Sequence, residues 1–99
     1  MSNLRSALTH KFNFYQAGLE AAVESLQVAK KNKDYEQIHK DELAEHNYMS
    51  IIADLEDILE VQDDELRAEL ELCIEKYEAG IAFVSTAVKN FRNILKNFD

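Results

Sequence analysis

Proline is absent from this 99-residue sequence, and glycine occurs only at Gly18 and Gly80. Sheets and loop-rich folds need these residues in their turns, so their scarcity favours long helices joined by short polar turns. The single cysteine, Cys73, excludes an intramolecular disulfide and a cysteine zinc site. No signal peptide is visible, and no apolar run approaches the roughly 20 residues that span a bilayer. We therefore expect an all-α, cytoplasmic protein with no membrane contact.

Sequence motifs of catalysis are also missing. There is no glycine-rich phosphate loop, nucleophile elbow or Cys/His dyad. His39, Glu42 and His46 share one helical face, but a di-iron bundle needs Glu-x-x-His on two helices, and only one such pair, Glu36 with His39, is present. We predict no enzyme activity, no catalytic residue and no cofactor. Whether the three residues ever hold a metal stays open.

Apolar residues recur at spacings of three and four along residues 2–31, 35–61 and 64–97. This spacing is typical of amphipathic helices. Asp34 and Gln37 have the pattern of a capping box at the start of the second helix. The N-terminal half of that helix is polar, so we expect it either to pack loosely or to await a partner. The sequence predicts a single domain, residues 1–99, folded as an antiparallel up-down-up three-helix bundle with long, coiled-coil-like helices.

Both glycines fall inside apolar stripes, where glycine costs about 1 kcal/mol relative to alanine. Close approach of another backbone or side chain would explain that cost, and in the predicted bundle the two glycines would lie at similar heights. Further apolar residues form extra rows, as expected of a thin bundle that associates with another helix. We predict self-association, most often as a homodimer, through these rows, whose candidate residues are Phe14, Gly18, Ala21, Val28, Gly80 and Phe83. The alternative is that they complete the core of the monomer.

Charge is distributed unevenly along the chain. The net charge is -8, yet residues 34–78 contain 16 acidic and three basic residues. Glu56 and Glu60 repel each other at a spacing of four, and both lie where a helix C-terminus disfavours anions. Such breaks of local rules are commoner at functional sites. The predicted acidic cluster, with Arg67 as its only local base, comprises Glu56, Asp57, Glu60, Asp63, Asp64, Glu65 and Glu69.

Three interpretations of the acidic cluster compete. It can be a solvated surface that maintains solubility, a docking surface for a basic protein, or a divalent-cation site. The last lacks the Asp/Asn and Gly pattern of a calcium loop. Direct nucleic-acid binding is disfavoured because it needs a basic face. We expect a non-enzymatic interaction module that binds a basic partner and can inhibit a nucleic-acid-binding protein. The alternative is a structural or chaperone-like protein that captures a partner helix or its own copy.

Overall fold

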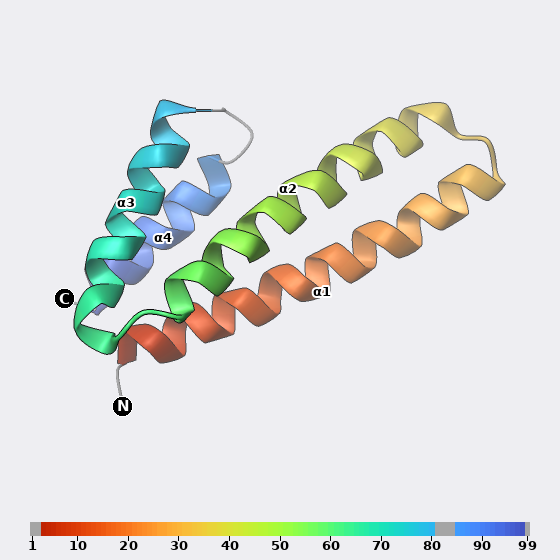
Figure 1. Cartoon of the computed structure of the whole chain (residues 1–99). Coiled ribbons are helices and arrows are strands. Elements are labelled where there is room, and N and C mark those ends of the chain that lie inside the picture. The colour runs from red at the N-terminus through yellow and green to blue at the C-terminus, as the bar shows by residue number, and fades with distance from the viewer. Residues whose placement is uncertain (1–2, 81–84, 99) are drawn as a thin grey trace.

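The computed structural model describes residues 3–80 and 85–98. Those residues form helices and short connections, which confirms the all-α class (Figure 1). The elements are α1 (Asn3–Lys31), α2 (Tyr35–Leu59), the 3-10 turn η1 (Asp63–Glu65), α3 (Leu66–Ala79) and α4 (Ser85–Asn97).

The turn between α1 and α2 is short and closed by hydrogen bonds at both helix ends. The backbone N–H of Asp34 donates to Ala29 O at 2.9 Å and that of Lys33 donates to Lys30 O at 3.2 Å, with Lys33 at φ 55°. This is a Schellman ending with lysine at the position that usually favours glycine. Asp34 Oδ1 accepts the N–H of Gln37 at 3.2 Å, which confirms Asp34 as the cap of α2. The predicted capping box is not completed, because the Asp34 N–H donates to Ala29 O and the Gln37 amide donates to Asp41.

The prediction of one helix over residues 64–97 is wrong, because two helices, α3 and α4, occupy that range. Gly80 is the C-cap of α3, and its N–H donates to Tyr77 O at 3.2 Å. Periodicity could not reveal the interruption, since the apolar rhythm continues across Gly80 and both helices present their stripes to the same core. Glycine is the least favourable residue there for continuing a helix apart from proline, which makes it a natural stopping point.

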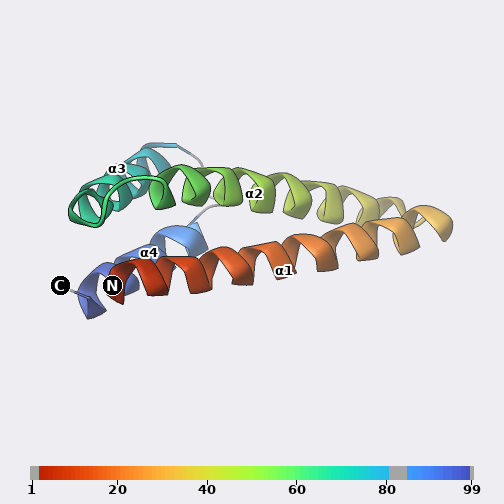
Figure 2. The ribbon, with the colours of Figure 1, turned by 60° about the horizontal axis from the view of Figure 1, so that its bottom comes forward.

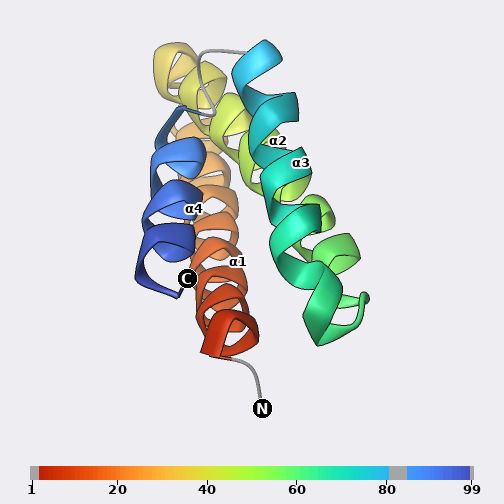
Figure 3. The same cartoon turned by 90° about the vertical axis from the view of Figure 1, so that its left-hand side faces the viewer.

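The four helices therefore form two hairpins instead of an up-down-up bundle of three. The α3–α4 hairpin packs across one end of the longer α1–α2 hairpin (Figure 1). Viewed from the side, α2 and α3 lie in one layer and α1 and α4 in the other (Figure 2). Figure 3 shows α4 beside α1 at this end. The molecule measures 48 × 27 × 20 Å, and its far end consists of α1 and α2 alone.

We call the four-helix part the packed end. It contains the largest fully buried side chains among the described residues: Leu8, Leu55, Leu66, Leu70 and Phe91. The Phe91 ring stacks on Tyr77 with centroids 6.1 Å apart and meets the edge of Tyr15 at 6.4 Å. These contacts join α4 to both α3 and α1. Tyr15, Tyr77 and Cys73 are buried in the same core.

We call the two-helix part, α1 from residue 18 and α2 up to residue 48, the arm. Its interior is narrow and contains Ala22, Leu26 and Ala29 together with a carboxylate, Asp41, which is only 7% exposed. Ser25 Oγ donates to Asp41 Oδ2 at 2.7 Å, and Gln37 Nε2 donates to Asp41 Oδ1 at 2.8 Å. The bond from Ser25 thus joins the polar half of α2 to α1, and the bond from Gln37, within α2, holds the Asp41 carboxylate in place.

Candidate functional site

The predicted acidic cluster lies at one corner of the packed end, where α2 stops, η1 turns and α3 begins (Figure 1). Six of the seven predicted carboxylates are exposed, and Glu69 is half-buried. Asp57 of α2 and Glu69 of α3 line the same shallow groove. The structure therefore brings together acidic residues from two helices and the turn between them.

Arg5 of α1 reaches into this corner, a contact that the sequence reasoning missed. Its Nε lies 2.5 Å from Asp63 Oδ1, and its Nη1 donates to Leu59 O at 2.6 Å. Its Nη2 donates to Val61 O. The guanidinium thus binds carbonyls at the C-terminus of α2, where the helix dipole favours a cation. Only the packing of the first turn of α1 against this corner brings Arg5 near, so a local sequence window assigned Arg67 as the sole nearby base.

Arg67 is directed away from the centre of the cluster. Its Nη1 lies 3.4 Å from Glu71 Oε1, and its Nη2 donates to Leu95 O at 3.0 Å. Apart from Asp63, no member of the predicted cluster forms an ion pair within residues 3–80 and 85–98. Of the six carboxylates without an ion pair in that part of the chain, five are exposed to solvent and Glu69 is half-buried.

The groove between α2 and α3 has a volume of about 210 Å³, and Asp54, one of its lining residues, is hydrogen-bonded to α3. Tyr77 Oη donates to Asp54 Oδ2 at 2.5 Å, and Lys76 Nζ lies 3.5 Å from Asp54 Oδ1. Burial, together with the hydrogen bond to Asp54, raises the pKa of Tyr77 well above its usual 10.0. Burial also raises the pKa of the neighbouring Cys73 thiol. Both groups stay neutral near pH 7, so neither supplies a nucleophile to the groove.

The apolar row predicted on α1 is exposed in the monomer. Phe14 is 55% exposed and Val28 58%, and Ala21 between them is exposed as well. Phe14 also packs edge-on against Tyr15 and lies under the Lys11 ammonium, 4.9 Å from its ring centroid. This row therefore does not complete the monomer's core.

The two glycines have different surroundings in the structure. Gly18 lies against Tyr48 of α2, and a Cβ there would meet the ring at 2.8 Å. Gly80 instead ends α3. The predicted close approach of a neighbouring group is thus confirmed at Gly18, whereas Gly80 is exposed and the atoms nearest to a Cβ there belong to its own helix. The remaining candidate, Phe83, lies outside the described residues.

The candidate metal-binding residues His39, Glu42 and His46 are exposed on α2. Over the described part of the chain, no group of three or more His, Cys, Asp or Glu side chains is arranged to hold a metal ion. Within the same residues, no helix combines the length and hydrophobicity needed to cross a membrane.

No protein-family model matches this chain, and no curated protein or solved structure resembles it significantly.

Proposed function

We propose that this protein is a non-enzymatic interaction module whose acidic corner docks onto a basic protein surface. The observation that carries the proposal is the set of six carboxylates without an intramolecular ion pair in the described structure, brought together where α2, η1 and α3 meet. Clustered charges of one sign attract a complementary surface and accelerate encounter with it.

The division of the helices into layers strengthens the charge asymmetry. Helix α2 contains seven acidic residues and one basic residue, whereas α4 contains three basic residues and no acidic one. Because α2 and α3 form one layer and α1 and α4 the other (Figure 2), the acidic helix α2 and the basic helix α4 belong to different layers. A basic partner would thus approach the α2–α3 layer.

A basic groove that normally holds nucleic acid is one surface of suitable chemistry. Such grooves neutralise regularly spaced phosphates with lysine and arginine. Carboxylates one helical turn apart, such as Glu56 and Glu60, can take the place of phosphates and pair with the same lysine and arginine side chains. In this form of the proposal the protein inhibits its partner by competing with nucleic acid, without binding nucleic acid itself.

A charge-reversal experiment tests the docking proposal. The corner variant changes Glu56, Asp57, Glu60 and Asp64 to Lys, and the probe is a helical Lys/Arg-rich peptide measured by titration calorimetry. We expect the corner variant to lose at least about tenfold in affinity at 50 mM salt, and the parent to lose most of its affinity by 300 mM, because exposed charges are screened. Circular dichroism should show unchanged helicity.

The matched control reverses four acidic residues of the arm, Glu20, Glu24, Glu36 and Glu42, and so changes the net charge equally. Retained binding by this arm variant, with loss in the corner variant, supports a localised docking surface. If both variants lose affinity to the same extent, the peptide responds only to net charge and the proposal fails.

A second candidate function, helix capture or self-association, is favoured by the exposed row of Phe14, Ala21 and Val28 on α1. Rows at seven-residue spacing match the seam of a coiled coil. Sedimentation should then show a salt-tolerant homo-oligomer, and Phe14→Asp with Val28→Asp should dissociate it. A parent protein that is monomeric at 100 µM would eliminate self-association.

A further inference from the structure

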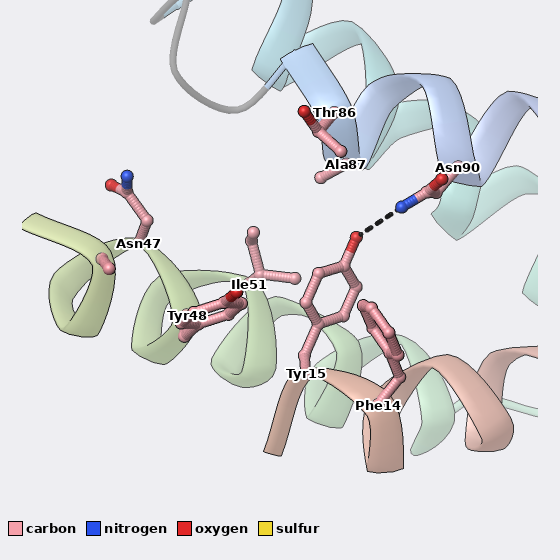
Figure 4. Close-up of a pocket in the computed structure, with 9 residues that line it drawn as sticks. Phe14, Tyr15, Asn47, Tyr48, Ile51, Thr86, Ala87 and Asn90 are labelled. Atoms are coloured by element: carbon pink, nitrogen blue, oxygen red, sulfur yellow. Dashed lines mark hydrogen bonds between the residues drawn. The ribbon is translucent and has the colours of Figure 1, made fainter. Parts of the chain in front are cut away.

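A cavity of about 330 Å³ opens where the arm joins the packed end, between α1, α2 and the first turns of α4. Its walls include the rings of Phe14, Tyr15 and Tyr48 and the side chain of Ile51 (Figure 4). It is separate from the acidic corner, since none of the seven predicted acidic residues lines it. An occupant of this cavity would act independently of the proposed docking surface.

The chemistry of the cavity wall is unlike that of the rest of the molecule. Charged residues make up 30% of the chain, yet no Asp, Glu, Lys or Arg is among the described residues that line the cavity. Burial raises the pKa of Tyr15, so its phenol stays neutral at pH 7. A charged ligand would lose its hydration here without gaining a partner. The wall therefore selects an uncharged molecule, and its aromatic rings favour a flat one.

Two polar groups at this wall have unused hydrogen-bonding capacity. The Tyr15 hydroxyl points toward α4, where it accepts a bond from Asn90 Nδ2 at 3.1 Å, and no described residue accepts its own proton (Figure 4). The side-chain oxygen of Asn47 is buried without a partner in the described structure. Buried polar atoms are normally paired. Since the terminal torsion of asparagine is broad, a rotation of the amide can turn this oxygen toward the cavity.

From this geometry we infer that the cavity binds a small, uncharged aromatic molecule that carries one N–H or O–H donor. The flat body contacts Phe14, Tyr15 and Tyr48, and the donor bonds to Asn47 Oδ1. The volume lies at the lower end of the roughly 300–1,000 Å³ range of ligand pockets, which suits one or two fused rings.

Indole and 1-methylindole are matched probes, because methylation removes the donor and leaves the fused rings. NMR spectra of methyl-labelled protein report on the cavity through Ala44, Ile51 and Ala87. We expect indole to shift these methyl signals saturably and 1-methylindole to bind about fivefold more weakly, as loss of one neutral hydrogen bond predicts. If indole causes no saturable shifts, the cavity holds only water and the inference is overturned. If the two probes bind with equal affinity, the proposed hydrogen bond from the ligand donor is overturned.

Two variants locate the site. Ala44→Leu adds volume at the cavity wall and should abolish indole binding. Asn47→Ala removes the acceptor, so indole and 1-methylindole should then bind with equal affinity. Ala53→Leu, at an exposed position on α2 outside the cavity wall and the proposed contact surfaces, is the control and should bind indole as the parent does. Indole binding that survives in Ala44→Leu, with helicity and methyl dispersion intact in all variants, would show that the probe binds elsewhere.

Discussion

The packed end and the arm are built from the same two long helices, yet they are stabilised differently. At the packed end α3 and α4 cover the first half of α1 and the second half of α2, and side chains such as Leu8 and Leu55 are fully buried. In the arm, two helices alone enclose small residues and the hydrogen-bonded Asp41. Two helices cannot bury a wide apolar stripe, so narrow packing and polar contacts replace it. We expect the arm to open locally at lower free energy than the packed end.

The largest expected difference comes from matched leucines. Leu55→Ala at the packed end should reduce the free energy of unfolding by about 3–5 kcal/mol, because neighbouring helices cannot close the cavity that it leaves. Leu26→Ala in the arm should cost about 2 kcal/mol, since the side chain borders solvent and the arm can collapse. Urea denaturation followed by circular dichroism measures both values. Equal losses would show that the arm and the packed end are equally well packed.

The polar contact of the arm should come next in size. Asp41→Ala leaves the Ser25 and Gln37 donors without their acceptor and should cost about 1–3 kcal/mol. Hydrogen exchange should accelerate in the arm more than in α3 or α4. The neighbouring exposed Glu42→Ala is the control and should stay within about 0.5 kcal/mol of the parent. Uniform acceleration over all helices would mean that the arm does not open separately.

The boundary between the two regions depends on Gly18. Gly18→Ala should destabilise the protein by about 1–2 kcal/mol, because the new Cβ forces the Tyr48 ring to move. In a Tyr48→Ala background the same change should instead stabilise it by about 1 kcal/mol through helix propensity. Thermal unfolding of the four proteins forms a double-mutant cycle. The same sign in both backgrounds would refute the importance of this contact.

The smallest effect is expected at the tip of the arm. Lys33 has φ 55°, a conformation that costs a side-chain-bearing residue about 1 kcal/mol or more, so Lys33→Gly should raise stability by up to about 1 kcal/mol. Lys31→Gly, at the last residue of α1, should lower stability by at most about 1 kcal/mol. Differential scanning calorimetry of the two variants measures both shifts. A loss of stability in Lys33→Gly would contradict the strain at this turn.

Helix positions and the first turn could be predicted from the sequence because they depend on local rules. The spacing of apolar residues located α1 and α2. The Asp34 cap was predictable because its side chain bonds to the backbone of Gln37, only three residues further along the chain. The interruption at Gly80 was missed, since a continuous stripe is compatible with one long helix or with two that fold back. Asp41 was missed as a core residue because nothing near it in sequence reveals that Ser25 will donate to it.

The acidic cluster was predicted from sequence because its members are neighbours along the chain, whereas the cavity unites residues more than 70 positions apart, such as Tyr15 and Asn90. Composition and periodicity by themselves determined that this chain is helical, acidic and amphipathic. Only the tertiary structure decided that the last apolar stripe folds into a hairpin, that Arg5 binds the end of α2, and that the acidic helices share a layer. The reason is physical: helix formation depends on residues within a turn or two, while packing depends on which distant surfaces exclude water together.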